Sequence, residues 1–482
     1  MQKLRTNLVD TSHTFMICRR KDIGFSVYPK NTKICGCIVQ KWQIRLFLPI
    51  PTRAEQPSKA LELLFLIQKM KNIFLLLLGL CIVCQPVLAQ KNKATQAKRK
   101  PLTRFTKTMM ALNRVANLPN AAQRKDAVAD FWEEMVSEGN VPYISGDSVA
   151  FLYKGEADSV FFHGDFDGWS ARPEGFQSRA RRVGKTDIWL LKASFPSAAR
   201  LDYKIVVNDR WILDPANPFQ QWGGAGPNSE LRMPAWHIEP ATVPNYDIVR
   251  GNLSENIRIK SRKLGYDVQY QVYTPADYED LRNLPTIYLT DGQEYSSSQM
   301  GSMITVLDNL IANKEIKPVI AVFIDPRNPD TLSQNRREKE LLLNDKFVDF
   351  VVTELVPEVD YNFKTSRKAA DRAMMGLSWG GLSTAYFGYK ASHTFSMLGL
   401  QSPEFGDKPE IYTFYEQSPK LPISRIFMST GTIRDTEKSA RRMKEIMEKK
   451  GYIVQYREVP EGHSWGNWRA LIDEPLIYFF AR

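Results

Sequence analysis

The chain has 482 residues, of which 43% are hydrophobic and 24% charged, an ordinary composition for a globular protein. Its length favours two or three domains over one core. The net charge of +12 is uneven: 13 of the 65 Lys and Arg but only 4 of the 53 Asp and Glu precede residue 90, which leaves +3 for the rest. A nucleic-acid-binding surface is therefore not expected.

The first unusual segment is MKNIFLLLLGLCIVCQPVLAQ, which begins at Met70. One lysine precedes an apolar run, and Val87-Leu88-Ala89 follows as a small-residue cleavage pattern. We predict a secretory signal peptide over 70–89, too short to span a membrane. Residues 1–69 would then be a spurious N-terminal extension. The alternatives are a genuine long leader or an internal core helix.

All cysteines precede the predicted cleavage point: Cys18, Cys35, Cys37, Cys81 and Cys84. The mature protein would therefore have no disulfide, no thiol nucleophile and no cysteine metal site. We expect it in the bacterial periplasm or outside the cell, without a stable membrane anchor.

Residues 90–144 are predicted to form a basic tether and a helix. The stretch KNKATQAKRKPLTRFTK at 91–107 is typical of a solvated tether. Residues 119–144 predict a helix that Asn120 caps and Gly139 ends. Its apolar side chains lie on one side: Val128, Phe131, Trp132 and Met135.

From 145 to 236, short β-branched and aromatic runs separated by turn residues predict a small β-sandwich. Two prolines indicate a linker at 237–250. Strand-like and helix-like segments alternate over 251–482, which predicts an α/β domain with a mostly parallel sheet. Strands are expected near 254–260, 266–273, 285–290, 318–324, 371–377, 424–430 and 453–458, and helices at 301–313, 345–355, 381–390 and 436–449.

The stretch RAMMGLSWGG places Ser378 between Gly376 and Gly380, after an apolar strand and before a helix. This is the context that a G-x-S-x-G nucleophile elbow needs, because the glycines leave room for the sharp turn. The alternative is a glycine-rich turn that only links strand to helix.

A serine nucleophile needs a histidine base and a carboxylate to orient it. His463 follows the predicted last strand and precedes the C-terminal helix, where an α/β-hydrolase carries its base. Asp435, just past a strand, gives the order Ser, Asp, His of that fold. Asp435 could instead cap the helix at 436–449. Its substitutes as the acid are Glu437, Asp407 and Glu404.

An oxyanion hole needs two backbone N–H groups. One is expected from Trp379, directly after the serine, and the other from Gly292 or Gln293 in TIYLTDGQEY. The proposed chemistry requires no metal or organic cofactor.

Residues 250–482 resemble the putative-esterase group of α/β-hydrolases, which contains enterochelin esterases, carbohydrate esterase family 1 feruloyl esterases and esterase D. The resemblance rests on YLTDGQEY, VFIDPRNP, MMGLSWGGLSTAYFGYKASHTFSMLGLQSP and EGHSWGNWR. It implies the same nucleophile, base and acid: Ser378, His463 and Asp435. Residues 145–236 are similar to the early-set immunoglobulin-like domain of such esterases and to carbohydrate-binding modules.

Trp169, Trp189, Trp211 and Trp222 could form a sugar-stacking platform, although packing of the sandwich is favoured. Arginine and indole groups suit an acidic or aromatic substrate. The candidate substrate-binding residues are Arg327, Arg336, Arg337, Trp465 and Trp468. Ion pairing with Glu338 and packing against the C-terminal helix are equally open roles for them.

We therefore predict a secreted serine esterase for an aromatic acyl ester, either a feruloyl-polysaccharide or a catecholate siderophore. The alternatives are a carbohydrate-binding protein with an inert hydrolase domain and an acyltransferase to a sugar.

Overall fold

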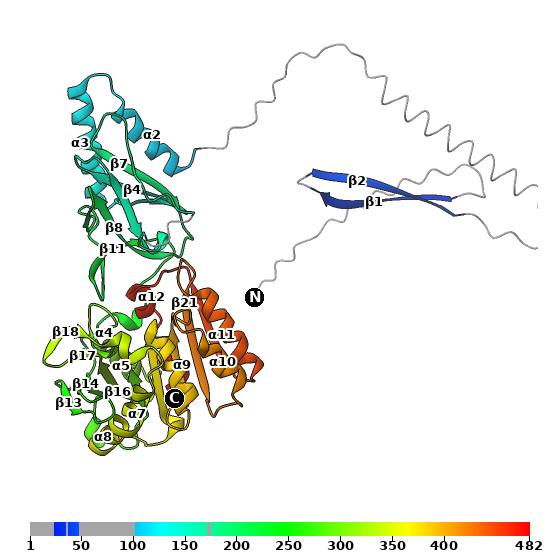
Figure 1. Cartoon of the computed structure of the whole chain (residues 1–482). Coiled ribbons are helices and arrows are strands. Elements are labelled where there is room, and N and C mark those ends of the chain that lie inside the picture. The colour runs from blue at the N-terminus through cyan, green and yellow to red at the C-terminus, as the bar shows by residue number, and fades with distance from the viewer. Residues whose placement is uncertain (1–23, 35–36, 48–101, 171–174) are drawn as a thin grey trace, which may run out of the picture. The chain divides into compact units, whose positions relative to one another are not determined.

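The computed structural model describes residues 24–34, 37–47, 102–170 and 175–482 (Figure 1). The predicted signal peptide and most of the predicted tether lie outside the described residues. The chain divides into two compact units, residues 1–100 and 101–482. In the first, β1 (Gly24–Ile34) and β2 (Cys37–Phe47) pair as antiparallel strands.

The second unit starts with α2 (Arg104–Ala116) and α3 (Ala121–Ser137). Helix α3 is the predicted helix: the Asn120 side chain accepts hydrogen bonds from two N–H groups of its first turn, and Gly139 past its end has φ 66°. Helix α2 was not predicted, and the tether prediction is wrong from residue 104 on. Its basic residues obscure an apolar spacing that buries Met109 and Leu112.

Two antiparallel sheets follow. The first has the order β3-β4-β7-β6 and the second β10-β11-β8-β5, with β9 beside β8. Phe151 of the first sheet packs with Phe162 and Tyr203 of the second, so the sheets form a β-sandwich. The likeness to an immunoglobulin-like domain stays a prediction. The strands are β3 (Tyr143–Ser145), β4 (Ser148–Lys154), β5 (Val160–Gly164), β6 (Arg181–Arg182), β7 (Ile188–Ser194), β8 (Arg200–Val207), β9 (Arg210–Ile212), β10 (Gln220–Gly223) and β11 (Gly226–Arg232).

The C-terminal part is built on a large sheet of order β12-β14-β16-β15-β19-β20-β21-β22, with β13 beside β14. From β16 to β22 neighbouring strands are parallel. The strands are β12 (Asn252–Leu253), β13 (Ile257–Lys260), β14 (Asp267–Thr274), β15 (Thr286–Leu289), β16 (Ile320–Asp325), β19 (Arg372–Leu377), β20 (Met397–Gln401), β21 (Arg425–Gly431) and β22 (Val454–Val459); β17 (Arg327–Asn328) and β18 (Thr331–Asn335) form a separate hairpin.

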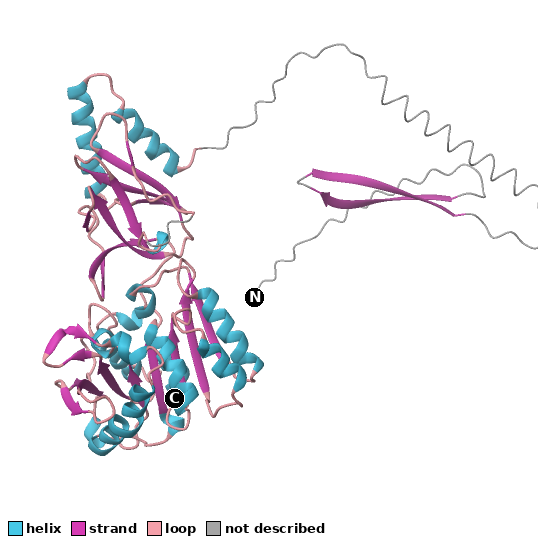
Figure 2. Ribbon diagram, viewed as in Figure 1, coloured by secondary structure: helices cyan, strands magenta, loops and turns pink. Residues whose placement is uncertain are grey.

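Helices cover both faces of this sheet (Figure 2), and each face has its own apolar cluster. The fold is that of an α/β-hydrolase, as predicted. The helices are α4 (Gly292–Ser296), α5 (Met303–Ala312), α6 (Arg337–Leu341), α7 (Asp345–Phe350), α8 (Val356–Asn362), α9 (Trp379–Ala391), α10 (Glu410–Gln417), α11 (Glu437–Lys449), α12 (Trp465–Arg469) and α13 (Asp473–Phe480).

Several elements of this part were not predicted, among them the β17–β18 hairpin, α10, β20 and the extension of the helix predicted at 345–355. Strand β20 is buried on both faces and lacks an alternating pattern, but β15, β16 and β19 are equally buried and were predicted, so burial alone does not account for the miss. The helix predicted at 345–355 continues to Asn362 through one π-helical turn, because Pro357 lies in the first turn of α8, where proline is tolerated. No helix among the described residues is long and apolar enough to cross a membrane.

Candidate active site

Ser378 occupies the turn between β19 and α9 with φ 54° and ψ −119°. Such a backbone costs of order 1–3 kcal/mol and persists only where its surroundings impose it. A Cβ at either Gly376 or Gly380 would collide with Thr290 Oγ1. The Ser378 N–H donates to Gln401 O at 2.9 Å, which ties the turn to β20. The turn therefore has the strand-to-helix geometry that the sequence predicted, and Ser378 as its nucleophile stays a prediction.

The structure brings Ser378, His463 and Asp435 together at the carboxyl edge of the parallel sheet. Nε2 of His463 lies 2.9 Å from Ser378 Oγ. Nδ1 of the same ring lies 2.7 Å from Asp435 Oδ1. The imidazole is one-third exposed, whereas the Asp435 carboxylate is fully buried.

The second oxygen of Asp435 is held by three donors. Oδ2 accepts hydrogen bonds from Ser402 Oγ at 2.6 Å, Gly431 N–H at 2.6 Å and Asn467 Nδ2 at 3.3 Å. The N-cap of α11 is Thr436, so Asp435 does not cap that helix. Its oxygens are directed to the histidine and to these supports.

Asp435 and His463 each stabilise the charged form of the other. Burial raises the pKa of Asp435, but the charge and hydrogen bond of His463, together with Ser402 and Gly431, lower it by more. Burial lowers the pKa of His463, and the charge and hydrogen bond of Asp435 raise it above its usual value. The protonated imidazole is therefore stabilised, as a proton-accepting base requires.

Among the described residues, none of the substitutes for the acid is hydrogen-bonded to His463. Asp407 accepts a hydrogen bond from Trp379 Nε1 at 2.6 Å. Glu404 interacts with His463 through its charge, and Glu437 begins α11. Of the other described histidines, His163 lies 2.6 Å from Asp167 in the sandwich and His393 is exposed.

The predicted oxyanion donors lie at two helix starts. Trp379 is the first residue of α9 and Gly292 the first of α4, with Gln293 next. The first N–H groups of a helix have no partner within it and are available to an anion. A Cβ at Gly292 would collide with the backbone of β16, so this glycine is also required for packing. Which of the two donates stays a prediction.

Three of the five candidate substrate-binding residues line the cleft, and two do not. Arg337, Trp465 and Trp468 line the cleft around Ser378. Arg327 pairs with Asp325 at 2.7 Å. Arg336 stacks on Tyr266, with its guanidinium carbon 4.1 Å from the ring centroid.

Arg337 also has structural partners. Its Nε donates to the buried Asp291 carboxylate at 2.8 Å, and its guanidinium carbon lies 5.0 Å from the centroid of the Trp379 ring. The ion pairing with Glu338 considered from the sequence is replaced by this pair with Asp291.

The cleft has a volume of about 440 Å³, and the β-sandwich supplies part of its wall. Trp169, Asp202, Asn228 and the β10–β11 turn at 223–226 face it across from Ser378. Sequence reasoning did not place these residues at the site, because no local pattern shows which sandwich loop reaches another domain. The glycine-rich QWGGAGPN stretch at the turn was the one available signal.

Three further residues were missed on the hydrolase side: Glu294, Ser402 and Asn467. Glu294 lines the cleft and accepts a hydrogen bond from Trp465 Nε1 at 2.7 Å. Burial raises the pKa of this carboxyl. All three stand inside or beside motifs quoted for the family resemblance, which is the signal that could have found them.

Residues 261–479 match the model of the family described as Putative esterase. This part of the chain is thus similar to the putative-esterase group of α/β-hydrolases, a group of carboxylic ester hydrolases.

The chain is also similar to two curated relatives and to one solved structure. The chain is 24% identical over 303 residues to an endo-1,4-beta-xylanase/feruloyl esterase of Xylanibacter ruminicola, covering 61% of this chain and 40% of the relative. It is 28% identical over 198 residues to an iron(III) enterobactin esterase of Escherichia coli, covering 40% of this chain and 46% of the relative. The chain therefore spans less than half the length of these two relatives.

The solved structure is the enterobactin esterase of Shigella flexneri, crystallised in the presence of enterobactin. The likeness has a TM-score of 0.58 at 21% identity and covers 69% of this chain and 92% of that one. It extends beyond the hydrolase domain, because residues 261–479 are a smaller share of this chain. At this identity it establishes the fold alone.

Proposed function

We propose that the chain is a serine esterase that works through an acyl-enzyme, with Ser378 as nucleophile, His463 as base and Asp435 as acid. The observation that carries the proposal is the unbroken hydrogen-bonded series from Ser378 Oγ through both ring nitrogens of His463 to the buried Asp435. A structural serine in a turn does not require a one-third-exposed imidazole and a buried carboxylate in this order.

In the first half of the reaction, Ser378 Oγ bonds to the ester carbonyl carbon while its proton moves to His463 Nε2. The negative oxygen is stabilised by the N–H of Trp379 and that of Gly292 or Gln293. The carbon–oxygen bond to the alcohol then breaks, and the alcohol leaves with the proton from His463. Water repeats the sequence on the acyl-enzyme, releases the acid and returns the proton to Ser378.

We further propose an aromatic acyl group, feruloyl or catecholate, as the substrate. Indole rings and a guanidinium lie beside Ser378: Trp465, Trp468 and Arg337. These groups suit the face and the acidic oxygens of a phenolic acid. The named relatives, a feruloyl esterase and an enterobactin esterase, act on the two kinds of ester, so both substrates remain in the proposal.

A sugar chain attached to that acyl group has a candidate contact on the sandwich. Trp169 lines the cleft, and its ring centroid lies 6.4 Å from that of Trp211, which is 47% exposed. Trp189, in contrast, is 6% exposed, which favours packing for this residue. The Trp169–Trp211 pair favours a polysaccharide-linked ester. It also supports the second candidate function, carbohydrate binding by the sandwich.

Export of the protein to the periplasm or the exterior is proposed on the signal-peptide pattern at 70–89. Mass spectrometry of the native N-terminus tests it. A mature chain that starts near Gln90 supports export and cleavage, and a chain that retains residues 70–89 contradicts them.

Turnover of methyl ferulate, ferric enterobactin and iron-free enterobactin tests the reaction and its substrate together. We expect one of these classes to be hydrolysed by the wild type and not by Ser378→Ala. Ser383→Ala, which removes a buried hydroxyl from α9, is the control and should keep activity. Binding to xylan without any hydrolysis would favour the inert carbohydrate-binding protein, and product that grows with added sugar acceptor would favour acyl transfer.

A further inference from the structure

The segments that carry His463 and Asp435 both contact the β-sandwich. Glu461, at the start of the segment of residues 461–466 that follows β22 and runs into α12, forms a parallel β-bridge with Arg200 of β8. Arg434, next to Asp435, donates through Nε to Phe166 O at 3.0 Å. Residues 461–466 are called the histidine segment below. The position of the histidine segment therefore depends on both the hydrolase domain and the β-sandwich.

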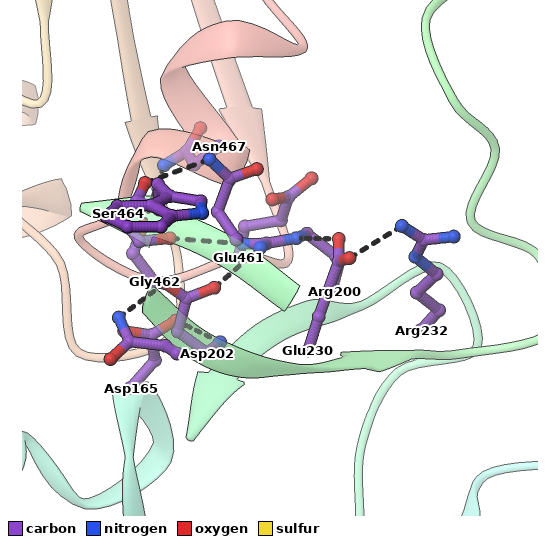
Figure 3. A network of polar contacts seen from close by, with 12 residues as sticks. Asp165, Arg200, Asp202, Glu230, Arg232, Glu461, Gly462, Ser464 and Asn467 are labelled. Carbon is purple, nitrogen blue, oxygen red and sulfur yellow. Dashed lines mark hydrogen bonds and ion pairs between the residues drawn. The ribbon is translucent and has the colours of Figure 1, made fainter. Parts of the chain in front are cut away.

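Arg200 is the centre of this contact (Figure 3). Its side chain is fully buried, and its Nη1 donates to Ser464 Oγ at 3.2 Å, one residue after His463. Nε donates to Glu230 at 2.6 Å, and Nη2 forms an ion pair with Asp202 at 2.5 Å. The guanidinium is thus fixed on two sides by the sandwich and presents its remaining edge to the histidine segment.

Two glycines of the histidine segment allow this approach. A Cβ at Gly466 would collide with the Arg200 guanidinium, and a Cβ at Gly462 would collide with the Asp165 side chain. The carboxylate of Asp165 in turn accepts a hydrogen bond from Asp202 N–H at 2.8 Å. The glycines on both sides of His463 therefore allow the sandwich to approach the segment closely at two further points.

Burying these charges costs desolvation free energy, which the attraction between them must offset. Burial lowers the pKa of Arg200, and the carboxylates of Asp202, Glu230 and Glu461 raise it by more, so the guanidinium stays charged. A buried ion network contributes little net stability compared with apolar packing, because desolvation offsets the attraction. Its best-attested use is to select one arrangement of the chain. Here the selected arrangement is that of the segment bearing the imidazole.

We propose that Arg200 is a positioning residue that makes the β-sandwich part of the catalytic unit. It acts through Ser464 and the backbone of the histidine segment to keep His463 Nε2 within hydrogen-bonding distance of Ser378 Oγ. Arg200 does not touch the reacting atoms. The inference rests on the proposed function of Ser378 and His463.

The test compares Arg200→Met, Arg200→Lys and Ser464→Ala with the wild type, using the full chain and the ester that the wild type hydrolyses. Arg372→Met is the matched control, because Arg372 is another buried arginine, paired with Asp360 at 2.8 Å at the opposite end of β19 from Ser378. Thermal unfolding curves identify an assay temperature at which every variant is folded. The rate of Ser378 labelling by a fluorophosphonate gives a substrate-independent measure of its activation.

Arg200→Met should lower kcat and the labelling rate about 100-fold with KM nearly unchanged, since a misplacement of about 1 Å costs that much. Arg200→Lys should be intermediate, because one ammonium cannot reproduce the fork of contacts. Ser464→Ala should lose several-fold. Added guanidinium ion at millimolar concentration should restore part of the activity of Arg200→Met.

A folded Arg200→Met with wild-type kcat, or an equal loss of kcat in Arg372→Met, would overturn the positioning role. Failure of the proposed function has a different signature. In that case the wild type neither hydrolyses esters nor reacts with the fluorophosphonate, and Ser378→Ala changes nothing.

Discussion

Two walls face each other across the cleft, and they are built differently. The hydrolase wall is the carboxyl edge of a parallel sheet, where Ser378, Asp435 and His463 follow three strands of one sheet. The sandwich wall consists of Trp169, Asp202 near the start of β8, Asn228 and the β10–β11 turn. Arg200, two residues before Asp202, contacts the histidine segment beside this wall. The first wall carries the groups that form bonds and move protons. The second shapes the cleft and supports the segment that holds the base.

This division means that a substitution on the hydrolase wall should stop the chemistry, whereas one on the sandwich wall should change its efficiency, its pH range or its substrates. The predictions below test the division, from the largest expected effect to the smallest.

Ser378→Ala removes the nucleophile. We expect kcat to fall by about 10⁶, to the level left by binding and the oxyanion hole. Steady-state kinetics and fluorophosphonate labelling followed by mass spectrometry measure it. An adduct on a serine other than Ser378, together with an active Ser378→Ala, would place the nucleophile elsewhere. The two walls would then not differ in the way described.

Asp435→Asn should lower kcat by about 10⁴, because the imidazole loses the partner that fixes its tautomer. It should also move the acidic limb of the pH–rate profile. The charge and hydrogen bond of Asp435 raise the pKa of His463, so without them burial dominates and the pKa falls. The base is then neutral at lower pH, and the limb shifts to lower pH. Glu437→Gln, two residues along the chain, is the control and should keep the wild-type profile; the reverse result would make Glu437 the acid.

The sequence predicted the hydrolase wall well because its chemistry is encoded locally. The elbow around Ser378 requires glycines at fixed offsets, and His463 and Asp435 each follow a recognisable strand. The parallel sheet was equally visible as alternating strands and helices. Strand β20 was not predicted, although β15, β16 and β19 are equally buried and were, so complete burial alone does not explain the miss.

The sandwich wall could not be predicted in this way. Arg200 belongs to a strand whose burial pattern is almost uniform, and its partners Glu461 and Ser464 lie more than 260 positions away. A buried arginine has the same local signature as an exposed one. Gly462 and Gly466 were visible, but what they make room for is known only once the two domains are placed together.

Glu461 and the carboxylates packed around it should make the contact between the histidine segment and the sandwich sensitive to pH. Burial raises the pKa of Glu461 to about 8, with the charge of Arg200 opposing the rise. The Asp165 and Asp202 carboxylates also contribute to raising it. A raised carboxyl pKa favours folding while the group is protonated. This stability is complete below the ordinary pKa near 4.5 and is lost as the pH rises through about 8.

Glu461→Gln should therefore flatten the decline in unfolding free energy between pH 5 and pH 9 by a few kcal/mol, since one pKa unit corresponds to about 1.4 kcal/mol. Urea unfolding at several pH values measures this. Glu445→Gln, at an exposed position of α11, removes the same charge and should run parallel to the wild type. A Glu461→Gln curve that is also parallel to the wild type would mean that this carboxyl keeps its ordinary pKa.

The smallest effect concerns the outer rim of the sandwich wall. Trp211→Ala should weaken binding of a feruloylated polysaccharide about tenfold or less, ~1.4 kcal/mol, because an exposed indole face is lost. Turnover of methyl ferulate should not change, since Trp211 does not line the cleft beside Ser378. Trp222→Ala is the matched control: it removes an indole that is 39% exposed from the same sheet but outside the Trp169–Trp211 pair. Equal losses from both tryptophans would mean general adhesion of the sandwich to sugar, and loss on methyl ferulate would mean that Trp211 acts on the cleft itself. Only weakened polymer binding with unchanged chemistry would show that the sandwich wall selects the substrate independently of the hydrolase wall.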